Sequence, residues 1–555
     1  MTVQSEPAGQ GKHNMDDYAA TYASFTLDVP EYINFAYDVV DNYAEDPQRE
    51  MMYWVDESGE ERRLSYAHFR DRSMQVAKAL LKLGLKRGDN VFIMMSRVPE
   101  WWESMLGMMK AGIVAMPGTT QLTPKDILFR LQNSHARGVI TDMDGAPKFD
   151  EVLGQYPGLQ ARIVTGGQRE GWTAYEEIVS AESPEGPRLA DTKSDDPLLL
   201  YFTSGTTGFP KMVLHTHSSY PLGHQITGRF WLDLQPGDLH WNLSDTGWAK
   251  AAWSSFFGPL NMGVSLFVHN SKGKYNASIT MGLIEKYGVT SFCAPPTVYR
   301  MLVADDLTKY DLSKLRSCVG AGEPLNPEVI EIWRKQTGMT IRDGYGQTET
   351  CLLVGNFPTP DMPVKPGSMG KAAPSYVVDV VDDEGNVLPP NQEGDIAVRI
   401  KPLRPVGLFK EYWNNPSATE ASYRGDWYIT GDRAYRDEDG YLWFVGRADD
   451  VIISAGYRIG PFEVESALVE HPAVLEAAVV AKPDEVRGEI VKAFVILKQG
   501  YEGTPELAAE IQKFVQQITA PYKYPREIEF VTELPKTVSG KIRRIELRER
   551  ERNKK

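Results

Sequence analysis

The sequence predicts an α/β protein with a large N-terminal domain of several subdomains and a small α+β domain at the C-terminal end. Between about residues 65 and 116, amphipathic helix patterns alternate with short apolar strand patterns, which is typical of a parallel sheet with crossover helices. The length of 555 residues exceeds what one ordinary core accommodates, so two or more domains are expected. Beyond about residue 460 the pattern changes to a separate set of short helices and strands.

The elements of the first half follow from periodicity and from helix-boundary residues. Apolar residues at helical spacing predict a helix over 32–40. Ser65 suits the start of a second helix and Gly84 its end, while Pro99 suits the start of a third. Short apolar runs predict buried strands over 91–95, 112–116 and 198–202.

The C-terminal unit has its own pattern. Helices are expected over 463–470 and 507–518, and strands over 474–481, 491–497 and 527–532. We therefore expect a flexible N-terminal segment over 1–25, followed by a large domain and a small C-terminal domain.

Composition narrows the function classes. The net charge of −15 argues against binding to nucleic acid and against stable membrane association. The three cysteines include no Cys-x-x-Cys pair, which favours a reducing compartment over a disulfide framework or a zinc site. No apolar run is long enough to span a bilayer, and the N-terminus lacks the apolar core of a signal peptide, so a cytoplasmic location is expected.

One stretch stands out, LLLYFTSGTTGFPKM over 198–212. A strand pattern leads into a loop with four hydroxyl residues and two glycines, followed by Lys211. Backbone N–H groups, hydroxyls and an ammonium form a donor-rich pocket that suits phosphate oxygens. The spacing differs from the P-loop, because Gly208 is not adjacent to Lys211 and Met212 follows the lysine. The alternative is a surface loop of small polar residues.

Four further strings carry polar residues in arrangements suited to a nucleotide. They are GAGEP (320–324), RDGYGQTET (342–350), YITGD with GRADD (428–450), and PKTVSGK (535–541). Together with the 198–212 stretch, they resemble the motifs of the adenylate-forming superfamily, which includes acyl-CoA synthetases, luciferases and peptide-synthetase adenylation domains. The resemblance covers the chain from about residue 30 onward. The strings GYRIGPFEVE and GEIVKAF are similar to those of AMP-forming medium-chain acyl-CoA synthetases.

The resemblance implies a set of ATP contacts. They are Thr203, Ser204, Gly205, Thr206, Thr207, Gly208, Lys211, Gly322, Glu323, Pro324, Asp343, Gly344, Tyr345, Gln347, Thr348, Asp432, Arg447 and Lys541. Within this set, Tyr345 is expected to stack on adenine, the backbone of Asp343 and Gly344 to read its edge, and Asp432 to accept both ribose hydroxyls. Glu349 is expected to hold Mg²⁺, which needs hard oxygen ligands. Lys541, Glu349 and Lys211 form the expected catalytic group.

The resemblance also implies an acyl pocket and a coenzyme A face. The acyl candidates are Trp248, Lys250, Trp253, Cys293 and Gly346; by composition alone the aromatic segment around Trp253 also suits a core. Glycine at 346, where acetate-specific relatives have tryptophan, is expected to leave room for a longer chain. The CoA candidates are Ala455, Gly456, Tyr457, Arg458, Arg487 and Lys523. The resemblance also implies that Asp449 is the hinge between the domains, so a large domain is expected over 26–448 and a small domain over 449–555.

The function implied is that of an AMP-forming acid–CoA ligase. A carboxylic acid and ATP give an acyl-adenylate and pyrophosphate, and CoA then gives acyl-CoA and AMP. A medium-chain or branched short-chain acid is expected, with rotation of the C-terminal domain between the two steps. An aryl (benzoate-type) CoA ligase and an adenylating enzyme with an acceptor other than CoA remain alternatives. The oligomeric state does not follow from the sequence.

Overall fold

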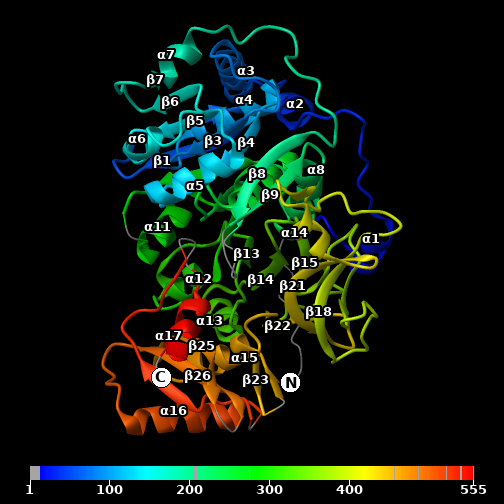
Figure 1. The fold of residues 1–555 in the computed structure, drawn as a ribbon, viewed down its shortest axis with the longest axis vertical. Helices are drawn as coiled ribbons and strands as arrows, with labels where there is room; N and C mark the ends of the chain where they lie inside the picture. Colours follow the sequence, from blue (N-terminus) through cyan, green and yellow to red (C-terminus); the bar gives the residue numbers. More distant parts are fainter. Residues whose placement is uncertain are drawn as a thin grey trace.

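The computed structural model describes residues 13–203, 210–273, 275–455, 457–484, 487–520, 522–537 and 541–553. Within these residues the strands form four sheets, and the mixed α/β class expected from the sequence is confirmed. Figure 1 shows the chain running from a lobe of blue and cyan elements, through green and yellow sheets, to an orange and red unit at the opposite end.

An eight-stranded sheet lies in the first lobe and carries the 198–212 stretch. Its order is β19-β9-β8-β4-β3-β5-β6-β7, and the strands from β8 to β7 run parallel. The bounds are β3 Asn90–Met94, β4 Val114–Pro117, β5 Gly138–Asp142, β6 Ala161–Thr165, β7 Thr173–Ala174, β8 Pro197–Thr203, β9 Lys211–Thr216 and β19 Glu411–Tyr412. Strands β8 and β9 form an antiparallel pair in which Thr203 faces Lys211.

A nine-stranded sheet carries most of the other motifs. Its order is β16-β15-β14-β13-β12-β10-β11-β1-β2, with a parallel central part from β14 to β1. The bounds are β1 Glu50–Asp56, β2 Glu61–Ser65, β10 Leu239–Asn242, β11 Ser265–Asn270, β12 Ser291–Ala294, β13 Ser317–Ala321, β14 Ile341–Gly346, β15 Leu352–Gly355 and β16 Lys371–Ala372. Because β12, β13 and β14 run parallel, the segments that follow them meet at one edge of the sheet.

Two five-stranded sheets complete the fold. One contains β17 Val378–Val381, β18 Glu393–Arg399, β20 Tyr423–Arg424, β21 Trp427–Arg436 and β22 Leu442–Arg447. The other contains β23 Ile452–Ser454, β24 Tyr457–Ile459, β25 Val474–Asp484, β26 Gly488–Leu497 and β27 Glu527–Phe530. The second sheet and its helices form the smaller C-terminal unit, which adjoins the rest where α15 packs on β22 (Figure 1). The predicted boundary at 448/449 stays a prediction.

The helices are given in chain order. They are α1 Tyr18–Ser24, η1 Ala36–Val40, α2 Asp41–Tyr43, α3 Tyr66–Lys82, α4 Pro99–Ala111, α5 Pro124–Ser134, α6 Ala146–Leu153, α7 Tyr175–Ser180, α8 Ser219–Ile226, η2 Thr227–Trp231, α9 Ala249–Ala251, η3 Ala252–Phe257, α10 Gly258–Met262, α11 Ala277–Tyr287, α12 Pro296–Leu302, η4 Leu307–Lys309, α13 Pro327–Thr337, α14 Pro416–Ala421, α15 Pro461–Val469, α16 Pro505–Ile518 and α17 Arg544–Asn553. Segments η1, η2 and η3 are π-helical and η4 is a 3₁₀ helix.

Boundary residues act as the sequence suggests. The Ser65 hydroxyl accepts a hydrogen bond from the N–H of His68 at the start of α3, which satisfies one of the free donors of the first turn. Pro99 opens α4, and Gly112 ends it in the left-handed conformation at φ 69°. The helix expected over 32–40 begins and ends later, because η1 (36–40) continues directly into α2 (41–43) and Tyr32 instead forms a β-bridge with Lys193.

The N-terminal segment contains a helix that the sequence analysis did not predict. Residues 18–24 form α1, whose tyrosines donate hydrogen bonds across the fold, from Tyr18 to the carbonyl of Ala372 (2.9 Å) and from Tyr22 to that of Tyr376 (2.8 Å). A helix of seven residues is marginal by itself, so tertiary contacts rather than local propensity stabilise it.

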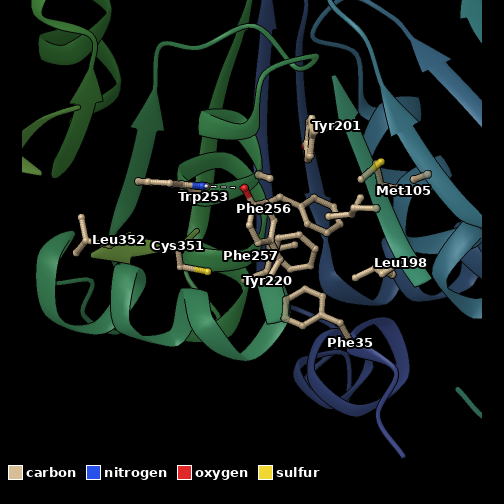
Figure 2. Packing of buried hydrophobic residues seen from close by; sticks show 14 of the residues in the cluster. Phe35, Met105, Leu198, Tyr201, Tyr220, Trp253, Phe256, Phe257, Cys351 and Leu352 are labelled. Carbon is tan, nitrogen blue, oxygen red and sulfur yellow. Dashed lines mark hydrogen bonds between the residues drawn. The ribbon is translucent and has the colours of Figure 1, made fainter. Parts of the chain in front are cut away.

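The largest hydrophobic core joins both large sheets and extends into the five-stranded sheet of β17, β18, β21 and β22. Figure 2 shows Phe35, Phe256 and Phe257 gathered beside Tyr220, with Trp253 and Cys351 on the other side. Phe256 and Phe257 pack edge to face at 4.9 Å between ring centroids. The aromatic segment after β10 therefore serves as core along η3 and places Trp253 next to β14.

Candidate active site

The buried carboxylate of Asp432, on β21, contacts residues from motifs that lie far apart in the sequence. Asp432 accepts hydrogen bonds from the Tyr345 hydroxyl (2.6 Å) and from the Gln347 amide (2.7 Å). Its other oxygen lies 3.3 Å from the Arg447 guanidinium. Asp432 is only 4% exposed, so these donors replace the water that a carboxylate otherwise requires. The structure thus brings together four of the predicted ATP residues, from β14, the turn after it, β21 and β22.

Lys541 belongs to the same cluster. Desolvation lowers the pKa of this lysine, although the residue keeps contact with solvent. The negative charges of Glu323, Asp432 and Glu349 oppose that shift in the pKa of the lysine. Hydrogen bonds with Thr537 in both directions hold the backbone of Lys541.

Glu349 and Lys211 meet at a tyrosine that the sequence analysis missed. The hydroxyl of Tyr412, in β19, donates to the Glu349 carboxylate (2.9 Å), and the Lys211 ammonium lies 4.6 Å from the centre of the Tyr412 ring. Burial raises the pKa of Glu349, and the bond from Tyr412 opposes that rise. Tyr412 carries no motif; only the pairing of β19 with β9 brings it here.

The donor set around Glu349 suits a metal that is held mainly by phosphate. Among the described residues there is no group of three or more His, Cys, Asp or Glu side chains able to hold a metal ion. Glu349 is one hard oxygen ligand beside a lysine. Mg²⁺ on a polyphosphate is typically held by one or two carboxylates and water, so one carboxylate fits that arrangement.

Most residues of the predicted phosphate loop lie outside the part of the chain that the structure describes. Ser204, Gly205, Thr206, Thr207 and Gly208 are not among the described residues. Thr203 and Lys211, which flank the loop, face each other in the β8–β9 hairpin. The carbonyl of Thr348 accepts hydrogen bonds from His215 (2.7 Å) and from the Tyr220 hydroxyl (2.6 Å).

Two residues of the expected adenine site, Asp343 and Gly344, have close partners within the protein. The backbone carbonyl of Asp343 accepts hydrogen bonds from the Trp231 indole (3.3 Å) and the Asn356 N–H (3.0 Å). The adenine-reading role of the Asp343 and Gly344 backbone stays a prediction. A Cβ on Gly344 would lie 2.5 Å from the Trp231 ring, which covers that glycine. Burial raises the pKa of the Asp343 carboxyl to about 8.

The Gly322–Pro324 turn has an open face. Gly322 has φ +111°, and a Cβ there would meet no atom within 4 Å. Glu323 accepts a hydrogen bond from the N–H of Thr297 (2.9 Å) and lies 3.1 Å from Arg300, both on α12. Glu323 is therefore fixed to its neighbouring helix, and the glycine leaves space in front of the turn.

Four of the five acyl candidates form two pairs, Lys250 with Cys293 and Trp253 with Gly346. Lys250 donates to the carbonyl of Ala321 (2.8 Å). Burial raises the pKa of the Cys293 thiol, and the charge of Lys250 opposes that rise. Trp253 packs on Gly346: a Cβ there would lie 2.4 Å from the edge of its ring and 2.4 Å from the carbonyl oxygen of Cys351. Trp248 stands apart as the half-buried residue before α9.

The contact between Trp253 and Gly346 corrects one expectation. Glycine at 346 does not leave an empty space at this point, because the Trp253 ring fills it. The ring is 5% exposed, and its indole N–H points at the Tyr220 hydroxyl at 3.4 Å (Figure 2). The glycine is needed for the close approach of the ring.

The CoA candidates lie around the β23–β24 hairpin of the C-terminal unit. Ala455 has φ +50°, and its N–H donates to the carbonyl of Arg487 (2.9 Å). Tyr457 is 52% exposed and stacks on Tyr522 at 4.3 Å between ring centroids. Lys523, next to Tyr522, pairs with Glu463 at 2.6 Å. Arg458 is exposed in β24, and Gly456 lies outside the described residues.

Asp449 lies at the junction of the two units. Its carboxylate is 3.9 Å from Arg447 on one side, and its carbonyl accepts a hydrogen bond from Arg548 of α17 on the other.

Comparison with known proteins identifies the family to which the chain is similar. A family model described as "AMP-binding enzyme" matches residues 40–413, and one described as "AMP-binding enzyme C-terminal domain" matches residues 463–541. The chain is 49% identical over 548 residues to the mitochondrial acyl-coenzyme A synthetase ACSM3 of Rattus norvegicus, covering 97% of this chain and 94% of the relative. Identity to the human ACSM3 protein is 50%, covering 97% and 93%.

Solved structures show the same fold. The anthranilate CoA ligase AuaEII in complex with anthranoyl-AMP matches with a TM-score of 0.87 and 32% identity, covering 94% of this chain and 98% of that one. An acyl-CoA synthetase of Brucella canis matches with a TM-score of 0.75 and 37% identity, covering 97% and 100%. No helix in the described ranges has the length and apolar character needed to cross a membrane.

Proposed function

Because the chain belongs to the AMP-binding enzyme family, within its acyl-coenzyme A synthetase branch, we propose that it activates a carboxylic acid with ATP and Mg²⁺ and transfers the acyl group to coenzyme A. In the first step a carboxylate oxygen attacks the α-phosphorus, and the bond to the pyrophosphate group breaks. In the second step the thiol sulfur attacks the acyl carbon, the thiol proton is lost, and AMP leaves with the electron pair.

The observation that carries this proposal is the convergence on Asp432. Tyr345, Gln347 and Arg447 contact its carboxylate, and Lys541 lies near it although the two are over 100 residues apart in sequence. A carboxylate offers about four lone-pair sites, so those left by Tyr345 and Gln347 suit the hydroxyls of a ribose. The open face at Gly322 supports the approach of a flat base to the turn.

The residues act mainly through position and charge. Bringing a carboxylate to a phosphate joins two anions, and Lys541 is the cation available to lie between them. Lys211, held at the Tyr412 ring, meets the departing pyrophosphate. Mg²⁺, when bound at Glu349, supplies positive charge to the same leaving group. No protein nucleophile is required, because orientation and electrostatics supply the acceleration.

The acid we propose is a medium-chain or branched short-chain one. The relatives are described as acyl-coenzyme A synthetases, and the Trp253 ring packed on Gly346 supplies an apolar surface that suits a hydrocarbon chain. An aryl acid is the second candidate, because a solved structure of the same fold, at 32% identity, is an anthranilate CoA ligase. CoA is proposed to meet the Ala455–Arg458 segment after rotation about Asp449.

The experiment is pyrophosphate release with ATP, Mg²⁺ and one acid at a time, with and without CoA. The acids are acetate, butyrate, 2-methylbutyrate, octanoate and benzoate. We expect turnover to peak between C4 and C8 and to require CoA for more than one cycle. A peak at benzoate would favour the aryl ligase. Sustained turnover without CoA would favour another acceptor, and no release with any acid would refute the proposal.

A cytoplasmic location stays part of the proposal. Cys293, Cys318 and Cys351 are buried and unpaired, which supports a reducing compartment. The relatives named above are described as mitochondrial, so fractionation of cells that express the full chain is the test.

A further inference from the structure

The last helix, α17, begins three residues after Lys541. It contacts the junction between the two units, which we define as residues 449 and 450. Arg544 and Arg548 are four residues apart, so they share one face of α17. Arg548 lies 2.7 Å from the Asp450 carboxylate and also donates to the Asp449 carbonyl. Arg544 binds both oxygens of Glu465, in α15, at 2.8 and 2.6 Å.

These ion pairs are poorly solvated. The side chains of Arg548 and Asp450 are 13% and 9% exposed, and that of Glu465 is 9% exposed. Charge-assisted hydrogen bonds of this kind are stronger than exposed surface pairs, and removing one partner leaves a buried charge unpaired. Poorly solvated ion pairs therefore bind the junction to α17.

Residues 448 to 450 are bonded first to the large unit and then to the C-terminal unit. Upstream, the N–H of Ala448 donates to the carbonyl of Gly431 in β21 (3.0 Å). Downstream, Asp450 is tied to Arg548, and α17 packs on the C-terminal sheet through the buried Leu547. Asp449 is the residue between these two sets of attachments, with its side chain toward Arg447 and its carbonyl toward Arg548.

We propose that Arg548 is a positioning residue that clamps the Asp449–Asp450 junction to the helix following Lys541, so that the junction and the lysine move as one rigid body. This inference rests on the proposed function. A rotation about Asp449 then brings Lys541 to one defined position, because α17 keeps the junction and the lysine at a fixed distance from each other. Without the clamp, Lys541 samples positions away from Asp432 and Glu349.

The test compares Arg548→Gln with Arg552→Gln. Arg552 lies one turn further along α17, is exposed, and has no ion pair or hydrogen bond among the described residues, so it is a matched control. The two half-reactions are measured separately: acid-dependent pyrophosphate release, and acyl-CoA formation from supplied acyl-adenylate. A charged hydrogen bond contributes enough for an effect of about tenfold to a hundredfold.

We expect Arg548→Gln to slow pyrophosphate release by that factor while acyl-CoA formation from the adenylate stays within about twofold, because the second step does not use Lys541. Arg548→Lys should recover part of the rate, since one ammonium can pair with Asp450 but lacks the fork of donors. Arg552→Gln should match the wild type. Equal losses in both half-reactions would indicate a general structural role and overturn the proposal, as would an unchanged first half-reaction.

A second measurement separates this inference from the proposed function. Hydrogen exchange of the peptide spanning 447–452 is followed in the full chain, where the N–H groups of Asp450 and Val451 donate to the Arg447 carbonyl. We expect faster exchange in Arg548→Gln and unchanged exchange in Arg552→Gln. If the wild type released no pyrophosphate with any acid, the proposed function would be wrong. Hydrogen exchange of residues 447–452 would still test whether Arg548 holds the junction. Unchanged exchange in Arg548→Gln would overturn the clamp in either case.

Discussion

Replacement of Gly346 by alanine tests the packing at the edge of the acyl pocket. The added Cβ would lie 2.4 Å from the Trp253 ring and 2.4 Å from the carbonyl oxygen of Cys351, well inside van der Waals contact. The ring is buried and the carbonyl is backbone, so neither moves aside without cost. Overpacking of this kind costs about 1–3 kcal/mol of the free energy of unfolding.

The assay is urea unfolding followed by tryptophan fluorescence, with midpoints compared at one protein concentration. Gly282→Ala is the matched control, because a Cβ at that position in α11 would meet nothing within 4 Å. Alanine in the middle of a helix is favoured over glycine by up to ~1 kcal/mol, so the control should be neutral or slightly stabilised. We expect only Gly346→Ala to unfold at lower urea.

A second substitution locates the strain. Trp253→Leu removes the ring contact and leaves the contact with the Cys351 carbonyl, so Gly346→Ala should cost less in that background. The acid preference of Trp253→Leu should also shift toward longer chains if the ring bounds the pocket. Wild-type stability of Gly346→Ala together with an unchanged acid preference would refute the packing argument.

Three further predictions concern the charged groups of the site. Lys541→Ala should abolish adenylation and spare acyl-CoA formation from supplied acyl-adenylate; equal losses in both half-reactions would contradict domain alternation. Tyr412→Phe removes the hydroxyl that donates to Glu349 but keeps the ring beside Lys211, so the KM for MgATP should rise several-fold, and titration of Mg²⁺ at fixed ATP measures it. The raised pKa of Asp343, about 8 against 3.8, means that the folded protein holds this proton more tightly than the unfolded chain, so the contribution to stability is full below pH 3.8 and is lost as the pH rises toward 8. Asp343→Asn should therefore gain stability relative to the wild type between pH 4 and 8 in urea unfolding, and a constant difference across that range would argue against the shift.

Local sequence signals determined much of the fold. Ser65 and Pro99 mark helix starts because capping and a fixed φ act within one turn. The elements expected over 463–470, 474–481 and 507–518 are present as α15, β25 and α16, because their apolar periodicity extends over whole elements. By contrast, α1 is too short to be stable by propensity and depends on contacts with residues over 300 positions away.

The sequence by itself also determined which residue types are available for nucleotide chemistry, because the motifs are short and contiguous. Only the tertiary structure decided how they meet. Asp432 gains its donors through the pairing of β21 with β22 and the approach of β14, and Tyr412 reaches Glu349 because β19 joins the edge of another sheet. The space at Gly346 is filled from η3, which no local pattern encodes. Chain-local forces fix caps and periodicity, whereas contacts between distant elements fix where a side chain points and what it touches.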